Sequence, residues 1–175
     1  MLEFNIDAKT PIPEILIRAE ETAKLVIEKL KARSHTLALA ESCTAGLISS
    51  LLAEISGASD ALWGSFVCYT KDAKISMLGL NKNELDACGL VSKETACSMA
   101  KGALQKSGAS MAASVTGLAG PLGDGSGVPV GTVWIGFAAS ASVEAREFHF
   151  TGSRNAVRIC AAIAALEIIL RTEFI

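Results

Sequence analysis

The chain has 175 residues, of which 50% are hydrophobic and 19% charged, and its formal net charge at pH 7 is −2. This length favours one domain, spanning residues 1–175, with residues 1–13 as an N-terminal extension. The low charged fraction excludes a disordered chain, and the excess of apolar residues favours a homo-oligomer. The negative net charge argues against nucleic acid as a partner, because such binding depends on neutralising phosphates.

The five cysteines and the N-terminus both indicate a cytoplasmic protein. The cysteines show no C-x-x-C spacing, so we expect reduced thiols, no metal site and no disulfide framework. The sequence begins MLEFNIDAKTPIPE, with acidic residues where a signal peptide is basic. An uncharged stretch from Gly125 to Val143 is interrupted by glycines and by Pro129, and we therefore expect no membrane partner.

The first half of the chain predicts helices that alternate with short strands. Apolar side chains recur at helical spacing over Glu14–Arg33, which indicates an amphipathic helix. The short apolar run Thr36–Glu41 predicts a buried strand, and helical spacing resumes over Thr44–Ile55. A second strand is expected at Ser65–Thr70, where β-branched and aromatic residues gather, and a short helix at Asp72–Leu78.

The second half predicts one long helix, three strands and a final helix. Ser92 is a good N-cap for a helix that reaches Ser107. The remaining elements follow in order: a strand at 110–117, a glycine-rich loop at 117–131, a hairpin of strands at 132–140 and 144–150, and a helix at 153–171.

This alternation predicts an α/β fold, a three-layer α/β/α sandwich around a mixed, mostly parallel sheet of about five strands. Ligands of such sheets usually bind at the loops that leave the carboxyl ends of the strands. The loops after Glu41, Thr70 and Thr116 are therefore the places where a site is expected.

The segment AESCTAG, Ala40–Gly46, has two interpretations. Ser42 or Thr44 could cap the following helix, because such side chains accept hydrogen bonds from the first helical amides. Alternatively, Ser42 is a nucleophile placed beside amides that receive a negative charge. The local sequence leaves both open.

A serine nucleophile needs a base, and YTKDAK offers Lys71 and Lys74 just after the second strand. A buried lysine acquires a lowered pKa and can act as that base, whereas the alternative is an ordinary solvated lysine. Tyr69 ends the same predicted strand. The two histidines, His35 and His149, lie away from the predicted strand-end loops.

Arg154 and Arg158 lie one turn apart at the start of the last predicted helix. Cations are unfavourable at this end of a helix dipole unless an anion is near. Either a bound anionic group or a salt bridge to a carboxylate accounts for them.

Several segments together resemble one family, the CinA carboxy-terminal domain of bacterial nicotinamide-nucleotide amidohydrolases. They occur in order between Thr36 and Leu170 and read AESCTAGLISSLLAEISGAS, FVCYTKDAKISMLG, VSKETACSMAKGAL, SVTGLAGP, PVGTVWIGFA and FTGSRNAVR. The resemblance implies hydrolysis of the carboxamide of nicotinamide mononucleotide to nicotinic acid mononucleotide and ammonia, with no cofactor and with this small nucleotide as partner.

The resemblance also implies roles for particular residues. Ser42 would be the nucleophile, Lys74 its base, and Tyr69 a neighbour that orients or shares the proton. The residues implied to bind substrate are Thr44, Thr116 and Gly117, which would line the pocket, and Arg154 or Arg158, which would hold the 5′-phosphate.

The chain departs from the family pattern at several positions. Ala45 stands where the family usually has glycine, and Gly64-Ser65 replaces an Arg-Gly pair. Lys71 replaces an asparagine, so it could lower the pKa of Lys74 by repulsion or fill the pocket and change the substrate. Val128 replaces a lysine. Two alternatives follow: a nucleotide-binding regulatory module without turnover, and an amidase for another small carboxamide.

Overall fold

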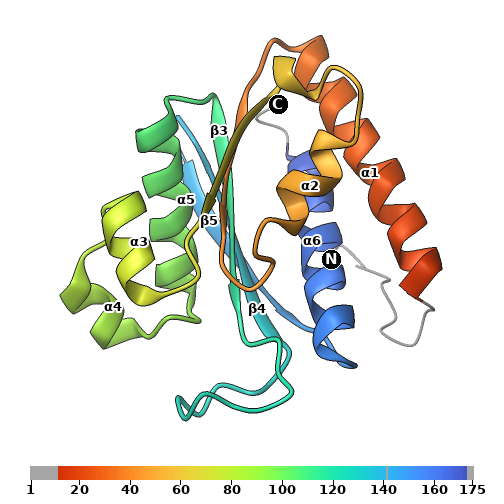
Figure 1. Cartoon of the computed structure of the whole chain (residues 1–175). Helices are drawn as coiled ribbons and strands as arrows, with labels where there is room; N and C mark the ends of the chain where they lie inside the picture. Colours follow the sequence, from red (N-terminus) through yellow and green to blue (C-terminus); the bar gives the residue numbers. More distant parts are fainter. Residues whose placement is uncertain (1–11, 141, 173–175) are drawn as a thin grey trace.

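The computed structural model describes residues 12–140 and 142–172, so most of the predicted N-terminal extension lies outside the described residues. A five-stranded sheet forms the centre of the molecule, in the order β2-β1-β3-β4-β5 (Figure 1). β1 pairs in parallel with β2 and β3, whereas β4 pairs antiparallel with β3 and β5, which confirms a mixed sheet. The strands are β1 (Leu37–Glu41), β2 (Leu62–Val67), β3 (Met111–Gly117), β4 (Thr132–Ala139) and β5 (Ser142–His149).

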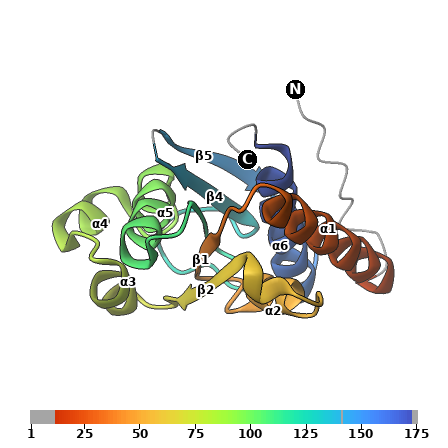
Figure 2. The ribbon, with the colours of Figure 1, turned by 90° about the horizontal axis from the view of Figure 1, so that it is seen from above.

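Helices cover both faces of this sheet, which confirms the three-layer α/β/α prediction (Figure 2). One face carries α1 (Ile12–Ala32), α2 (Leu47–Ala53) and α6 (Arg154–Arg171). The other carries α3 (Lys71–Leu78), α4 (Lys82–Cys88) and α5 (Lys93–Ser107). Within the described ranges, no helix is both long and apolar enough to cross a membrane.

The larger core lies between the sheet and α1, α2 and α6. The predicted apolar stripe of α1 is buried from Ile15 to Leu30, and α6 is buried along almost its whole length. Many of the buried α6 residues are alanines, so this helix packs closely against its neighbours. Burying one Leu or Ile side chain contributes about 1.5–3 kcal/mol, and this face therefore provides most of the apolar stabilisation.

The smaller core lies under α3 and α5. Gly102 of α5 allows α3 to approach closely, because a Cβ at this position would lie 2.6 Å from the carbonyl oxygen of Leu78. Met99 and Leu78 are buried at this contact. The close packing fixes α3 against the sheet and thereby fixes Lys74, a charged residue type that lies almost fully buried on this helix.

The predicted boundaries of β2 and α2 were wrong. The second strand was expected at Ser65–Thr70, but β2 spans Leu62–Val67. The strand begins earlier, at Leu62. Its pairing with β1 shifts register between Leu62 and Gly64, which are the partners of Leu37 and Ala38. It ends earlier because Thr70 leaves the strand to cap α3, with its side chain accepting a hydrogen bond from the amide of Ala73.

The helix expected at Thr44–Ile55 is also shorter, since α2 spans Leu47–Ala53. Ala45 has a φ of 50° and Gly46 a φ of 89°, both in the left-handed region, which a right-handed helix cannot include. Residues Ser42–Gly46 instead form a tight turn between β1 and α2, named here the Ser42 turn.

Candidate active site

The carboxyl ends of three neighbouring parallel strands meet at one edge of the sheet, as the sequence predicted. The amide of Ser42, after β1, donates to the carbonyl oxygen of Val115 in β3 at 2.9 Å. The amide of Cys68, after β2, donates to the carbonyl oxygen of Glu41 at 2.9 Å. The loops that follow Glu41 and Val67 are thus held side by side.

Ser42 and Lys74 lie in direct contact at this edge. The Nζ of Lys74 lies 2.8 Å from the Oγ of Ser42 and 2.8 Å from the carbonyl oxygen of Cys68. Lys74 is 1% exposed and Ser42 is 8% exposed. In the described part of the chain, Lys74 forms no ion pair with a carboxylate.

Burial lowers the pKa of Lys74, because the charged ammonium loses its hydration. A neutral amine suits the two contacts of this side chain. It can donate one hydrogen to the carbonyl oxygen of Cys68 and accept the hydroxyl hydrogen of Ser42. The arrangement can therefore remove a proton from Ser42.

The thiol next to Ser42 does not compete as a nucleophile. Burial raises the pKa of Cys43 to about 11, and burial also raises the pKa of Cys68. A thiol is nucleophilic as the thiolate, so these two side chains stay unreactive near neutral pH. The chemistry at this edge falls to the Ser42 hydroxyl.

Ser42 is not the cap of the following helix, and neither is Thr44. The carboxylate of Glu41 takes that place: its Oε2 accepts from the amides of Gly46 at 2.9 Å and Ile48 at 3.1 Å, and its Oε1 from the amide of Ser49 at 3.0 Å. Sequence reasoning missed this role. The available signal was an acidic residue at the end of an apolar strand, which indicates that the carboxylate needs partners but does not identify the amides that supply them. The hydroxyl of Ser42 is thereby left to Lys74.

The departure at Ser65 has a structural explanation. The Oγ of Ser65 in β2 donates to the Oε1 of Glu41 at 3.0 Å, a contact that a glycine could not make. β2 therefore helps to satisfy the buried carboxylate and ties it to the Ser42 turn.

The two arginines of α6 have different partners. The Nε of Arg158 donates to the carbonyl oxygen of Cys43 at 3.0 Å, and its Nη2 to that of Thr44 at 2.8 Å. Arg154 is exposed, and it donates from Nη1 to the carbonyl oxygen of Gly120 and from Nη2 to the Oη of Tyr69, both at 2.7 Å. Neither arginine forms a salt bridge to a carboxylate within the described residues.

Tyr69 lies beyond the end of β2 and not inside a strand, with 51% of its surface exposed. Its hydrogen bond to Arg154 links the β2–α3 loop to the beginning of α6. Through Arg154 it is also linked to the glycine-rich loop at Gly120. The hydroxyl of Tyr69 thus has Arg154 as its partner in place of Lys74.

The remaining predicted pocket residues lie around the same edge: Thr44 and Thr116 are buried and Gly117 is half-buried. The Oγ1 of Thr44 is buried and makes no hydrogen bond to any described residue. The Oγ1 of Thr116 donates to the carbonyl oxygen of Leu90 at 2.7 Å. Gly117 allows β3 and β4 to approach, because a Cβ there would lie 2.8 Å from the carbonyl oxygen of Thr132.

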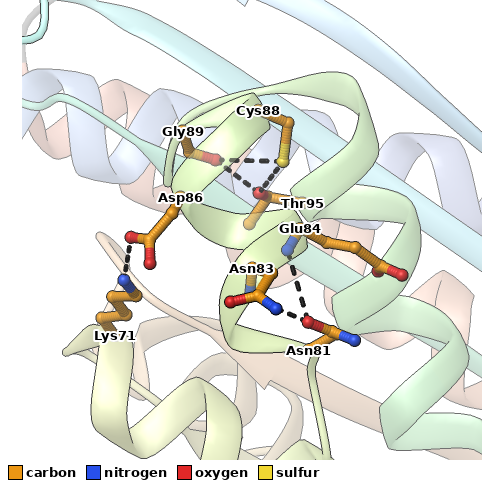
Figure 3. A network of polar contacts seen from close by, with 8 residues as sticks. All are labelled: Lys71, Asn81, Asn83, Glu84, Asp86, Cys88, Gly89 and Thr95. Atoms are coloured by element: carbon orange, nitrogen blue, oxygen red, sulfur yellow. Dashed lines mark hydrogen bonds and ion pairs between the residues drawn. The ribbon is translucent and has the colours of Figure 1, made fainter.

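Lys71 does not point at Lys74. Figure 3 shows Lys71 paired with Asp86 of α4, and this ion pair joins α3 to α4. The expectation that repulsion from Lys71 lowers the pKa of Lys74 is wrong, since burial is the cause and Lys71 is not among the contributing charges. Lys71 lines a cavity of about 520 Å³ together with Asp124 and Ser126 of the glycine-rich loop.

Known proteins are similar in sequence to this chain over most of its length. The sequence model of one protein family, described as the CinA C-terminal domain, matches residues 19–173 of this chain. The chain belongs to the CinA C-terminal domain family. The resemblance expected from the sequence is thereby confirmed.

Members of the CinA family resemble the chain in sequence and in structure. A nicotinamide-nucleotide amidohydrolase PncC from Enterobacter agglomerans is 41% identical over 159 residues, which cover 90% of this chain and 96% of that protein. The crystal structure of the competence/damage inducible protein CihA from Agrobacterium tumefaciens aligns with a TM-score of 0.84 and 39% identity, covering 89% of this chain and 96% of that one.

Other CinA relatives are longer than the region they share with this chain. A CinA-like protein from Syntrophomonas wolfei is 41% identical over 135 residues, which are 77% of this chain and 32% of that protein. The chain spans about a third of the length of this relative and of several others that it matches.

Proposed function

We propose that the chain is a serine amidohydrolase that removes ammonia from the carboxamide of nicotinamide mononucleotide. The observation that carries the proposal is the 2.8 Å contact between Lys74 Nζ and Ser42 Oγ, in a setting that lowers the pKa of the amine. Support for the substrate comes from the relative named nicotinamide-nucleotide amidohydrolase, which matches nearly the whole chain.

In the first half of the reaction, neutral Lys74 takes the hydroxyl proton of Ser42 while the Ser42 oxygen attacks the carboxamide carbon. The carbonyl oxygen becomes an oxyanion. The amides of Cys43 and Thr44 are suited to bind it, because within the described residues neither makes a hydrogen bond to another backbone group. The protonated Lys74 then gives its proton to the leaving nitrogen, the C–N bond breaks, and ammonia departs from an acyl-enzyme ester.

In the second half, a water molecule enters and Lys74 takes one of its protons. The resulting hydroxide attacks the ester carbon, and the same amides bind the second oxyanion. The bond between the Ser42 oxygen and the acyl carbon breaks, and Lys74 returns a proton to Ser42. The products are nicotinic acid mononucleotide and the free enzyme, and the sequence of steps needs no cofactor.

Arg154 is the better placed of the two α6 arginines for the 5′-phosphate. Its guanidinium is exposed at the edge of the site and bonds to two neutral oxygens, those of Gly120 and Tyr69. A phosphate would give stronger, charge-assisted hydrogen bonds than either of these partners. Arg158, in contrast, is already engaged by two carbonyls of the Ser42 turn.

The test is ammonia release from nicotinamide mononucleotide by the purified protein, with Ser42→Ala as the comparison. The proposal expects one ammonia for each nicotinic acid mononucleotide formed by the wild type, and none above background from Ser42→Ala. Equal release by both proteins would remove Ser42 from the reaction.

The burial of Ser42, which is only 8% exposed, favours one alternative: a nucleotide-binding module without turnover. Calorimetric titration with nicotinamide mononucleotide distinguishes the two functions. Binding by the wild type without any release of ammonia would support the module and contradict the amidohydrolase.

A further inference from the structure

We propose that Arg158 is a positioning residue that holds the Ser42 turn in its reactive shape, and that it does not bind the substrate's phosphate. The proposal rests on the serine chemistry of the proposed function. It starts from the two hydrogen bonds by which the Arg158 guanidinium spans the carbonyl oxygens of Cys43 and Thr44.

A planar guanidinium that donates hydrogen bonds to two successive carbonyl oxygens fixes the orientation of the peptide planes to which they belong. Among the described residues the cis peptide bond is that of Gly120 and Pro121, so the peptides of the Ser42 turn are trans. In a trans peptide the carbonyl and the following amide point in opposite directions. Arg158, bound to the carbonyl of Cys43, therefore turns the amide of Thr44 away from itself.

The same contact strengthens that amide as a donor. A cation bonded to a peptide oxygen polarises the peptide and makes its N–H a better hydrogen-bond donor, since hydrogen bonds in a chain reinforce one another. The amide of Thr44 is one of the two groups assigned to the oxyanion. Arg158 thus acts on the reaction through the backbone, without touching the substrate.

The turn needs such a constraint because its conformation is unfavourable by itself. Ala45 adopts a φ of 50°, which costs an ordinary L-residue free energy. Arg158 holds the carbonyl groups at the start of the turn, and the carboxylate of Glu41 holds the amides at its end, from Gly46 onward. Together the two side chains determine the position of the Ser42 oxygen relative to Lys74.

The experiment compares wild type with Arg158→Lys and Arg158→Met, and uses Arg146→Met on β5 as a matched control. Ser42 is labelled with phenylmethylsulfonyl fluoride, and the labelled peptide is followed by mass spectrometry. In this reaction the Ser42 oxygen bonds to sulfur, the S–F bond breaks, Lys74 takes the hydroxyl proton and fluoride leaves. The probe carries no phosphate, so its rate reports the turn and the base alone.

We expect both Arg158 variants to be labelled at least about tenfold more slowly than wild type, since small misplacements of reacting groups have large effects on rate. Lysine retains the charge, but its ammonium donates from a single nitrogen and lacks the two separate, coplanar N–H groups of the guanidinium fork, so it does not rescue the rate. The kcat for nicotinamide mononucleotide and for nicotinamide riboside should fall by the same factor, with the ratio of the two KM values unchanged. Arg146→Met should behave as wild type.

A wild-type labelling rate in Arg158→Lys, or a rise in KM confined to the phosphorylated substrate, would overturn the proposal. If Arg158→Met does not fold, as judged by circular dichroism, Arg158→Lys decides, because it keeps the aliphatic stem and the charge. Labelling of wild-type Ser42 without ammonia release would count against the proposed substrate only, and the variants would still decide the role of Arg158. Absence of wild-type labelling would overturn the activated serine and this proposal with it.

Discussion

Helices α3 and α6 each begin with two cations one turn apart, and the comparison between them explains the site. On α3, Lys71 pairs with Asp86 while Lys74 reaches the hydroxyl of Ser42. On α6, Arg154 contacts Gly120 and Tyr69, while Arg158 reaches the carbonyls of the Ser42 turn. In each pair, one cation faces outward and the other contacts the Ser42 turn.

The difference lies in the chemistry of the inner cation. Burial lowers the pKa of Lys74, so this amine can lose its proton and act as a base. A guanidinium in a protein keeps its proton, so Arg158 can hold the turn but cannot take a proton from Ser42. Similar placement on two helices thus gives one base and one positioning group.

The largest effect is expected at Lys74. Lys74→Met should lower kcat/KM for nicotinamide mononucleotide by about 10³-fold, the scale of a lost general base. Lys71→Met is the matched substitution one turn away on α3. Ammonia release provides the measurement. An equal fall in kcat/KM for Lys74→Met and Lys71→Met would contradict the assignment of Lys74, and not Lys71, as the base.

The pH dependence of the free energy of unfolding offers a second test of the Lys74→Met substitution. Because the pKa of Lys74 is lowered in the folded state, the unfolded chain binds more protons between that lowered pKa and 10.5, and wild-type stability should rise with pH across this window. Lys74→Met should lose this contribution to the slope. Denaturant unfolding at several pH values provides the check.

The next effect is expected at Arg154, the outer cation of α6. Arg154→Ala should raise KM for nicotinamide mononucleotide about tenfold or more, because a charge-assisted contact to the phosphate is lost. KM for nicotinamide riboside should change much less. Steady-state kinetics on the two substrates would contradict the assignment if both KM values rose equally.

A smaller effect is expected in the turn that both helices contact. Ala45→Gly should remove the left-handed strain of about 1 kcal/mol and raise the melting temperature by about 2–4 °C. Calorimetry on Ala45→Gly and on Ala53→Gly, in the last turn of α2, provides the contrast. The second variant should be destabilised, because glycine disfavours a helix.

The smallest effect is expected from the outer lysine of α3. Lys71→Asn restores the residue usual in the family, and the melting temperature should stay within about 2 °C of wild type because exposed ion pairs contribute little. Kinetics with a panel of small carboxamides completes the test. A change of preferred substrate would show that Lys71 selects the substrate after all.

The contact between Ser42 and Lys74 could be predicted from the sequence, because neighbouring parallel strands bring together the loops that follow their carboxyl ends. The buried stripe of α1 was predicted for a similar reason, since helical periodicity is visible in the local sequence. These features depend on short-range pattern and on a general rule of sheet topology.

The contacts of Glu41 and Arg158 could not be predicted in the same way. Arg158 is separated in sequence by 115 positions from Cys43, to which it donates a hydrogen bond. The spacing of one helical turn between Arg154 and Arg158 does not indicate which of the two arginines points inward. The cap of α2 depends on a carboxylate reaching past the turn, whereas Ser42 and Thr44 are the residue types that usually cap helices. Such partners are set by tertiary packing.

The most direct test of the account is the titration of Lys74 beside the pH dependence of catalysis. We predict that nitrogen-detected magnetic resonance of the Lys74 Nζ gives a pKa below 10.5, and that kcat/KM for nicotinamide mononucleotide rises with pH on the same curve. A Lys74 that titrates at or above 10.5, or activity that falls as this amine loses its proton, would contradict it.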